Sequence, residues 1–599
     1  MNMPRLVLAV AATAVLAGCA SAPMSSRSTA MATQFDSVRV TEHRGSDDLL
    51  TAGLGLSGLR AMTPPAYADP AAPTPAELRR RAVWANWRGI ADVAPGGGYG
   101  EVYGSLAAVP GREFHAFARV PGAHQPHRIA VQVPDAFDQA ARCIVVAPAS
   151  GSRGVLGAIA VAAPWALPKG CAVAYTDKGA GTDYFDLDAG LGVRADGTVG
   201  APADGLAFVP DPASGRGVAV KHAHSRDNPE ADWGVHVKQA AEFALQALDR
   251  AFPQAAPFAF DNTTVIAVGI SNGGGAVLRA AEADGDDWLD AVVAGAPNIT
   301  VAGARPLYDY TTEAALLMPC ALPALGIPPM PTAAAQCAAL ADAGLVSGDT
   351  LEARQRSAYD TLRASGWTDA ALRAGSISVG FDLWRAVAVT YAPAYGRHGA
   401  TEQPCGYSFA AQTKEGAARP ATAAERAAWP ADGGGIPPGA GVGIVAPTRD
   451  PGEPLAGLQC LRALWEGEGG ADAARVRAGI DEVRAGLPRA GLPVTVIHGL
   501  DDGLIPPAFS SAPYVAAARA AGRDVRYWQV RNAQHFDAFL GLPVYGAQYL
   551  PLLPYVYEAL DRTWAHLHEG APLPADAVVE TTQRGAGNAL EPRHLAIPE

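Results

Sequence analysis

The chain has 599 residues, of which 49% are hydrophobic and 18% charged, so it is long enough to bury a large core. Its formal net charge is -13, and no cluster of Lys and Arg of the kind that binds a phosphate backbone is present. The composition therefore indicates a globular protein and argues against nucleic acid as a partner.

The first residues follow the order of an export signal. Arg5 is followed by an apolar stretch up to Leu16 and by small residues before Cys19. The apolar stretch is shorter than the roughly 20 residues of a transmembrane helix. The sequence Leu-Ala-Gly-Cys also resembles the bacterial lipobox, which implies removal of residues 1–18 and lipidation of Cys19. We expect a lipoprotein of the periplasm or outer membrane, with simple secretion as the alternative, and a flexible tether over 19–34.

The ordered part of the chain is expected from about residue 35. A helix is predicted over 76–92, because its apolar residues repeat at helical spacing after a Thr-Pro start. Two β-like runs, 114–120 and 128–133, predict an antiparallel hairpin. Nearly continuous apolar runs separated by helix-length segments then predict parallel strands buried on both faces. These runs are 143–147, 171–175, 265–270, 289–294, 494–497 and 525–530.

The strand rhythm is interrupted between residues 298 and 485, in a region rich in Pro, Gly and Ala with helix-like pieces such as 381–391. Strands resume at Val494, which an inserted cap explains and a tandem domain does not. The predicted architecture is an α/β-hydrolase fold, a mostly parallel sheet with a large inserted, mainly helical cap. Residues 35–297 and 486–599 would form the two parts of its core.

Ser271 lies in the pentapeptide Gly269-Ile-Ser-Asn-Gly273, between a predicted strand and a predicted helix. A nucleophile at the tip of such a sharp turn leaves no room for side chains two residues to either side, which accounts for the two glycines. The pentapeptide alone is weak in a chain with 66 glycines, but its strand-turn-helix context is specific. We predict Ser271 as the nucleophile and the backbone N–H of Asn272 as one oxyanion donor.

A serine hydroxyl needs a base, and the base needs a group that orients it. Residues 498–506, His-Gly-Leu-Asp-Asp-Gly-Leu-Ile-Pro, resemble the loop that carries the acid in many α/β-hydrolases. The spacing of the proline favours Asp502 over Asp501 as the acid. His535 follows in the loop after the last predicted strand and is the predicted base. The 231 residues between Ser271 and Asp502 exceed the usual spacing, which again indicates an insertion.

The second oxyanion donor is expected in the loop after the strand 143–147. The backbone N–H groups from Gly151 to Arg153 are the candidates, and Ser152 is our choice among them. Arg153 and Lys178 are the basic residues that we expect near the mouth of the site, where one of them would receive a substrate carboxylate.

Three histidines could be considered as metal ligands, namely His222, His224 and His236. No carboxylate stands at ligand spacing beside them, and serine chemistry needs no metal. A hydrogen-bonding role or a place in a pocket wall is favoured. Neither a metal nor a cofactor is expected.

Six cysteines remain if Cys19 is lipidated, an even number in a chain bound for an oxidising compartment. The sequence allows fifteen pairings of these six cysteines. We favour Cys143 with Cys171, Cys320 with Cys337, and Cys405 with Cys460.

Several longer motifs are more specific than the pentapeptide. They include 47–55 (Asp-Asp-Leu-Leu-Thr-Ala-Gly-Leu-Gly), 97–100, 150–154 (Ser-Gly-Ser-Arg-Gly), 171–179, 222–225, Asn228-Pro229, 271–275 and 534–537 (Gln-His-Phe-Asp). Together they resemble the bacterial D-3-hydroxybutyrate oligomer hydrolases over nearly all of the mature chain. The resemblance implies an exported enzyme that hydrolyses the ester bonds of short 3-hydroxybutyrate oligomers downstream of a polymer depolymerase, with its nucleophile at Ser271. Members of that family are often secreted, whereas this chain carries a lipobox.

Other functions remain open at this point. A capped esterase of the tannase or feruloyl esterase kind would share the triad and differ in its pocket. A non-catalytic lipoprotein that uses the fold for binding is a second alternative, against which the ordered Ser, Asp and His argue. A polymer depolymerase is disfavoured, because no Ser/Thr-rich linker leads to a separate C-terminal binding domain.

Overall fold

The computed structural model describes residues 1, 34–433, 441–448, 453 and 455–598. Residues Gln34–Glu599 form one compact unit. Apart from Met1 and Gln34, the predicted signal peptide, the predicted lipidation site Cys19 and the predicted tether lie outside the described residues. Within the described part of the chain, no helix combines the length and the apolar character that a bilayer crossing requires.

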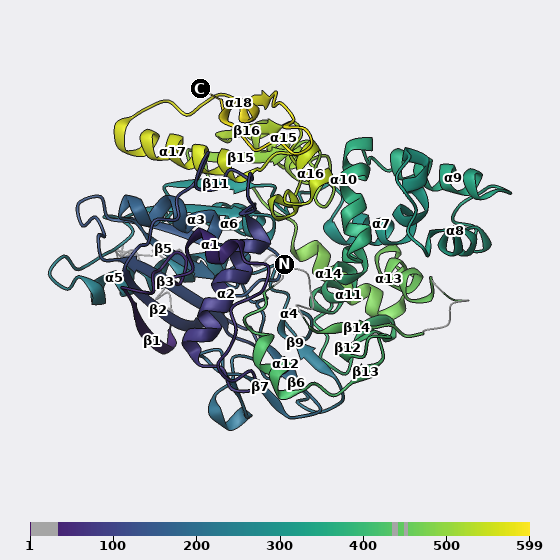
Figure 1. Cartoon of the computed structure of the whole chain (residues 1–599), viewed down its shortest axis with the longest axis horizontal. Helices are drawn as coiled ribbons and strands as arrows, with labels where there is room; N and C mark the ends of the chain where they lie inside the picture. The colour runs from purple at the N-terminus through teal and green to yellow at the C-terminus, as the bar shows by residue number, and fades with distance from the viewer. Residues whose placement is uncertain (2–33, 434–440, 449–452, 454, 599) are drawn as a thin grey trace. The chain divides into compact units, whose positions relative to one another are not determined.

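A ten-stranded sheet forms the centre of this unit, in the order β1-β2-β3-β5-β4-β10-β11-β15-β16-β17 (Figure 1). The strands from β5 to β17 in this order are parallel, and β1, β2 and β3 form an antiparallel edge. The strands are β1 (Asp36–His43), β2 (Gly111–Ala118), β3 (His127–Pro134), β4 (Cys143–Pro148), β5 (Ala172–Thr176), β10 (Thr264–Ile270), β11 (Ala291–Gly295), β15 (Val494–Gly499), β16 (Val525–Val530) and β17 (Ala577–Val579). The predicted hairpin and the predicted parallel strands are confirmed, whereas β1 and β17 were not predicted.

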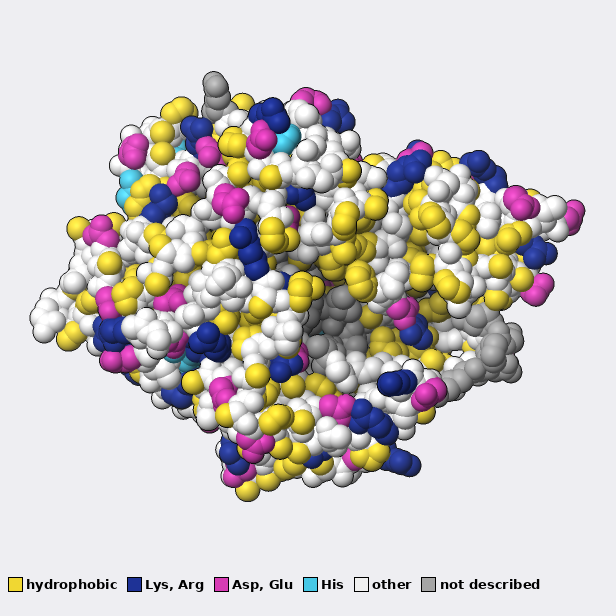
Figure 2. Space-filling view, in the orientation of Figure 1, with side chains coloured by type: hydrophobic (Ala, Val, Ile, Leu, Met, Phe, Trp, Pro, Cys, Tyr) yellow, Lys and Arg dark blue, Asp and Glu magenta, His cyan; other side chains and the backbone are white. Residues whose placement is uncertain are grey.

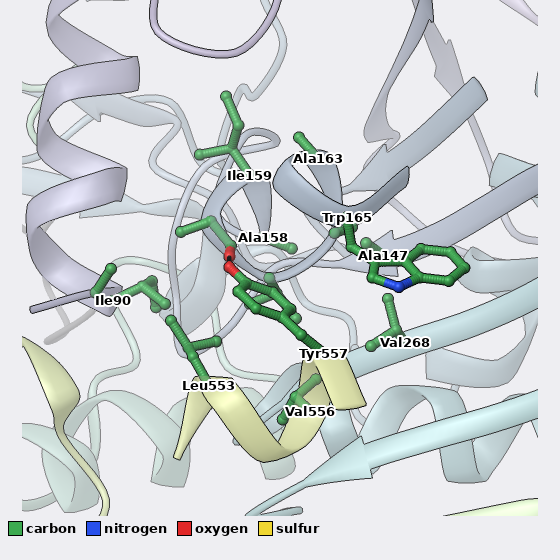
Figure 3. Packing of buried hydrophobic residues seen from close by; sticks show 14 of the residues in the cluster. Ile90, Ala147, Ala158, Ile159, Ala163, Trp165, Val268, Leu553, Val556 and Tyr557 are labelled. Carbon is green, nitrogen blue, oxygen red and sulfur yellow. Dashed lines mark hydrogen bonds between the residues drawn. The ribbon is translucent and has the colours of Figure 1, made fainter. Parts of the chain in front are cut away.

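Both faces of the sheet are buried. Successive residues of β4 illustrate this, because Val145 belongs to one apolar cluster and Val146 to the cluster on the opposite face. Helices α3 (Ile159–Ala166) and α17 (Leu553–Glu569) pack into the first cluster, and α5 (Trp233–Ala251) and α6 (Asn272–Glu282) pack into the second. Figure 3 shows residues of α3, of the strands and of α17 gathered in the first cluster.

Helix α2 (Pro75–Ile90) confirms the predicted N-terminal helix and its start. The Thr74 side chain accepts the N–H of Glu77, and the Glu77 carboxylate accepts the N–H of Thr74 in return. This reciprocal cap, together with proline at the first helical position, defines where α2 begins.

A cap interrupts the sheet domain. None of the described residues between 298 and 485 joins the ten-stranded sheet; they form helices and a small antiparallel sheet, β13-β12-β14. The elements are α7 (Leu307–Ala321), α8 (Ala333–Asp342), α9 (Leu351–Ala364), α10 (Asp369–Gly380), α11 (Leu383–Tyr395), β12 (Ser408–Gln412), β13 (Ala418–Arg419), α12 (Ala423–Ala428), β14 (Gly443–Val445), α13 (Ala456–Glu466) and α14 (Gly470–Glu482). On the face drawn in Figure 2, hydrophobic side chains are interspersed with charged ones over α7 to α10.

The cap is larger than the single insertion that the sequence predicted. Tyr184, Val218 and Val220 pack into the hydrophobic cluster of the cap rather than into the clusters of the sheet. They belong to a four-stranded sheet, β8-β7-β6-β9, which is followed directly by α4 (Lys221–His224). Its strands are β6 (Tyr184–Asp186), β7 (Leu191–Val193), β8 (Val199–Gly200) and β9 (Val218–Val220). A second, earlier segment of the chain therefore contributes to the cap.

Three disulfides stabilise the fold, and each of the favoured pairings is confirmed. Cys143–Cys171 links the start of β4 to the residue before β5. Cys320–Cys337 links α7 to α8, and Cys405–Cys460 links a turn before β12 to α13. Two of the three bonds therefore hold the cap together.

Candidate active site

Ser271 lies at the tip of a strained turn between β10 and α6. Its φ of 58° and ψ of -127° fall outside the regions that side chains normally allow. A Cβ atom on Gly269 would lie 2.3 Å from the backbone of Gly273, and one on Gly273 would lie 2.5 Å from the Pro148 carbonyl oxygen. Both glycines are thus required by close backbone contacts, as the pentapeptide predicted.

The three residues predicted as nucleophile, base and acid meet in one hydrogen-bonded chain. His535 Nε2 lies 2.9 Å from Ser271 Oγ, and His535 Nδ1 lies 2.7 Å from Asp502 Oδ2. The ionised Asp502 can only accept, so Nδ1 carries the proton and the lone pair of Nε2 faces the serine hydroxyl. This is the arrangement in which a histidine can take the proton of a serine.

The carboxylate that contacts His535 is that of Asp502, as predicted, and not that of Asp501. Asp502 is fully buried and accepts the N–H groups of Leu504 and Ile505 at 2.9 and 2.7 Å. Burial alone would raise the pKa of Asp502, but the charge of nearby His535 and the hydrogen bonds from histidine hold it well below its usual range. The carboxylate is therefore kept ionised beside the base.

His498 is a second histidine on the same carboxylate, and sequence reasoning did not assign it a role. Its Nε2 lies 3.2 Å from Asp502 Oδ2 and 2.9 Å from the carbonyl oxygen of Ile505. Its Nδ1 lies 2.6 Å from Ser511 Oγ. Its place at the head of the predicted acid loop was the one signal in the sequence that could have identified it.

The loop after β4 reaches the site, and the residues on both sides of the predicted donor Ser152 line it. Ser150, Gly151 and Arg153 line the pocket that contains Ser271, whereas Ser152 does not. The hydroxyl of Ser152 lies 2.8 Å from His222 Nδ1 instead. Asn272 lines the pocket as the first residue of α6, where a backbone N–H has no acceptor within its own helix.

Lys178 contacts the loop after β4 and does not line the pocket, so its predicted place at the mouth of the site is wrong. It is fully buried, and its Nζ donates to the Gly151 carbonyl oxygen at 2.6 Å. Burial lowers the pKa of Lys178 to about 7. Because the C=O and N–H of a trans peptide point in opposite directions, the N–H of Ser152 points away from Lys178.

Arg153 does line the pocket, but its guanidinium also has partners in the protein. It donates to the carbonyl oxygens of Gly433 and Gly89 at 2.7 and 2.8 Å. Burial lowers the pKa of Arg153 to about 10. Arg153 thus lies at the boundary between α2, the cap and the catalytic pocket.

The predicted hydrogen-bonding role is confirmed for two of the three histidines. Burial lowers the pKa of His222 to about 3 and that of His224 to about 4, so both are neutral. His222 packs its ring edge-on against Tyr391 and bonds Ser152, and His224 Nε2 lies 2.7 Å from Gln403 Oε1.

Cap helix α11 is tied to the nucleophile turn through a polar network that the sequence did not reveal. Asn272 Nδ2 donates to the Tyr391 hydroxyl at 2.6 Å, and Asn298 Nδ2 lies 3.1 Å from Asn272 Oδ1. Asn298 also donates to Glu230, which accepts the hydroxyl of Tyr395 at 2.5 Å. Burial raises the pKa of Glu230 to about 7. The cap is therefore anchored directly beside Ser271.

The catalytic pocket is small and mostly apolar, with a volume of about 90 Å³. Nine aliphatic residues of the core and of the cap line it, namely Ile90, Ile270, Leu307, Leu383, Val387, Leu504, Ile505, Leu552 and Leu553. Asp537 also lines it; burial raises the pKa of Asp537 to about 7, and its carboxylate accepts the N–H groups of Leu552 and Leu553. The pocket can therefore hold a short acyl group out of water.

The fold and the site together define an enzyme of the α/β-hydrolase class. A mostly parallel sheet carries Ser271 after one strand and Asp502 and His535 after the two strands beyond the cap, in the order typical of that class. A model of the 3HB-oligomer hydrolase family matches residues 15–597. The chain belongs to this family.

Sequence relatives agree with this assignment. The chain is 39% identical to a D-(-)-3-hydroxybutyrate oligomer hydrolase of Paracidovorax citrulli, with 90% of this chain and 87% of the relative covered. It is 37% identical to the protein of the same name from Burkholderia cenocepacia, with 98% and 94% covered.

Solved structures align less closely. A feruloyl esterase B from Aspergillus oryzae aligns with a TM-score of 0.36 at 12% identity, over 82% of this chain and 85% of its own. A tannin acyl hydrolase from Aspergillus niger aligns with a TM-score of 0.34 at 12% identity, over 78% and 80%. At TM-scores this low, neither alignment bears on the substrate.

Proposed function

We propose that this protein hydrolyses the ester bonds of D-3-hydroxybutyrate oligomers, including the dimer, and releases 3-hydroxybutyrate. The observation that carries the proposal is the hydrogen-bonded chain from Ser271 through His535 to Asp502, at the wall of a small apolar pocket. Family membership over residues 15–597 supports the choice of substrate.

The proposed reaction proceeds through an acyl-enzyme. His535 takes the proton of Ser271 as Oγ attacks the ester carbonyl, and it then gives this proton to the departing alcohol oxygen. A water molecule, deprotonated by the same histidine, next attacks the acyl-serine. His535 then gives this proton to Ser271 Oγ as the bond from Oγ to the acyl carbon breaks and the hydroxy acid is released. The protein supplies nucleophile, base and acid from its own side chains, so this sequence of steps calls for no cofactor.

Two backbone N–H groups are proposed to stabilise the negative charge that develops on the carbonyl oxygen. One is that of Asn272, at the start of α6, where the helix dipole also favours an anion. The other is that of Ser152, which points away from Lys178 because Lys178 holds the carbonyl oxygen of the same peptide. The ammonium group of Lys178 polarises this peptide and makes its N–H a stronger donor.

Product analysis tests the proposed function. Purified protein is incubated with 3-hydroxybutyrate dimer, trimer and solid polymer, with Ser271→Ala as the inactive control and a feruloyl ester as the competing substrate. We expect release of monomer from dimer and trimer by the native protein alone. Turnover of polymer but not dimer, or preferential turnover of the feruloyl ester, would overturn the substrate assignment.

We further propose that the protein is exported and anchored by a lipid on Cys19. Three disulfides in the described part of the chain support an oxidising compartment. Metabolic labelling with palmitate tests the anchor: label in the native protein and none in Cys19→Ala is expected, and equal labelling of the two would contradict it.

A further inference from the structure

A second cavity adjoins the catalytic pocket. Its volume is about 460 Å³, roughly five times that of the catalytic pocket, and the two share Gly89, Arg153 and Phe536 as lining residues. The end of α2 and the loop behind it form one side, and the loop that follows His535 forms another. Phe381, between α10 and α11 of the cap, completes the wall. The two cavities therefore meet at these three residues.

The charged residues of this cavity are mostly cationic. Arg60, Arg88 and Arg153 line it, against the single carboxylate of Asp92. Asp92 is buried; burial raises its pKa, and its carboxylate lies 3.7 Å from the guanidinium of Arg584. Arg60 is 3.3 Å from the carboxylate of Glu101. The cavity is thus a positive region in a chain whose net charge is -13.

The hydrogen-bond acceptors of Arg88 in the described part of the chain are all neutral. It is half-buried, and it donates to the carbonyl oxygens of Leu59 and Arg60 at 3.1 and 3.3 Å and to Met62 Sδ at 3.1 Å. Its guanidinium also lies 5.1 Å from the centroid of the Trp84 ring. Among the residues that the structure describes, none supplies a carboxylate at salt-bridge distance from Arg88, and burial lowers its pKa. A half-buried guanidinium without a counter-ion favours binding of an anion from outside.

The remaining wall is apolar and partly exposed. Phe381 of the cap stacks on Phe539 of the core with ring centroids 5.1 Å apart and an angle of 17° between the planes. The side chains of Met62 and Leu542 line the same cavity and are exposed. Such a wall suits a chain of methyl-bearing ester units that ends in a charge.

We propose that Arg88 binds the terminal carboxylate of the oligomer in this second cavity. The inference rests on the proposed function, because a 3-hydroxybutyrate oligomer has one anionic group, its free carboxyl end. The carboxylate belongs to the alcohol side of every ester bond in the oligomer. The alcohol portion therefore occupies the larger cavity, while the acyl portion fills the small pocket beside Ser271. Arg88 replaces Arg153 and Lys178 as the carboxylate receptor expected from the sequence.

The test compares substrates that differ in this charge and in one methyl group. Steady-state KM is measured for 3-hydroxybutyrate trimer as the free acid and as its methyl ester, with native protein, Arg88→Gln and Arg88→Lys. In the native protein we expect a KM at least tenfold lower for the acid than for the methyl ester. Arg88→Gln should raise KM for the acid about tenfold or more and leave that for the ester nearly unchanged. For Arg88→Lys, the KM for the acid should lie between those of the native protein and Arg88→Gln.

A matched control is Arg385→Gln. Arg385 is partly exposed in the cap close to Phe381, forms an ion pair with Asp382 and does not line the cavity. The substitution Arg385→Gln should leave the KM for the acid and the KM for the methyl ester unchanged. Turnover of the methyl ester serves as an internal check that each variant is folded, and the lysine variant keeps the charge if the glutamine variant does not fold.

Two results would overturn the inference. The first is an equal rise of KM for acid and ester in Arg88→Gln, because that pattern indicates a general change in the cavity. The second is a native protein that hydrolyses both forms with the same KM. A native protein that hydrolyses neither form is a different failure, since it would overturn the proposed function as well.

Discussion

Asp502 is surrounded by hydrogen-bond donors, so replacing it by asparagine is a severe test of the proposed triad. Its Oδ2 faces His535 Nδ1 and His498 Nε2, and its Oδ1 faces the N–H groups of Leu504 and Ile505. His498 Nε2 carries a proton, because it also lies 2.9 Å from the carbonyl oxygen of Ile505, which can only accept. An amide NH2 group at position 502 would meet donors in either orientation.

Each orientation of the asparagine has a distinct cost. With the amide oxygen toward His535, the N–H groups of Leu504 and Ile505 lose their acceptor, and a buried unsatisfied donor costs about 1–3 kcal/mol of stability. With the NH2 group toward His535, Nδ1 must accept, and the proton moves to Nε2, where it faces Ser271. A histidine in this tautomer cannot take the serine proton, and the comparable change in serine proteases lowers kcat by about 10,000-fold.

We therefore expect Asp502→Asn to lower kcat by about 10,000-fold, with little change in KM, and to lower the melting temperature. Asp501→Asn is the matched control, because Asp501 is adjacent and its carboxylate contacts neither histidine among the described hydrogen bonds. Acid release from trimer in a pH-stat gives kcat and KM, and calorimetry gives the melting temperature. A kcat within tenfold of the native value, or similar losses in the two variants, would refute the reasoning.

Three further predictions concern other buried groups. Lys178→Met should lower kcat about 10- to 100-fold without changing KM, since a charged hydrogen bond contributes about 1.5–3 kcal/mol, whereas the control Lys238→Met should leave kcat unchanged. The native protein should also lose activity as the pH rises through about 7, and this loss should be absent from Lys178→Met. The pKa of Asp537 is raised to about 7, so the folded state binds a proton that the unfolded state has lost, and the free energy of unfolding should fall from about pH 4 to pH 7. Urea unfolding at several pH values should show a smaller fall for Asp537→Asn, and the same fall in both proteins would exclude this assignment. Replacing both Cys405 and Cys460 by serine, which opens a loop with a sequence separation of 55, should lower the free energy of unfolding by about 4 kcal/mol, and calorimetry showing no change would contradict that estimate.

The sequence by itself predicted the central strands of the sheet, the strained turn at Ser271 and the three residues that the structure joins by hydrogen bonds. These features depend on local chemistry that a linear pattern records. Strands buried on both faces are continuously apolar, as Cys143–Pro148 shows, and the strained turn at Ser271 requires glycine at both flanking positions. The order of Ser271, Asp502 and His535 along the chain follows the order of the strands that carry them.

The edge strand β17 and the second insertion could not be predicted from the sequence, because their strands are too short to show a pattern. The strand β17 has only three residues, and it becomes a strand through its pairing with β16. The four-stranded sheet β8-β7-β6-β9 likewise consists of strands of two or three residues, and it packs against helices more than 80 positions further along the chain. Neither has a periodicity long enough to be recognised.

Only the tertiary structure decided which way the loop residues around the site face. In the sequence, Lys178 and Arg153 have similar surroundings, because each is a basic residue that follows a predicted buried strand. The structure turns Lys178 inward onto the Gly151 carbonyl oxygen and places Arg153 between the two cavities. Arg88 lies on α2 with no local signal, and it reaches the site because the loop after His535 folds back beside that helix. Side-chain direction depends on packing between segments that are far apart in the chain, and no local pattern records it.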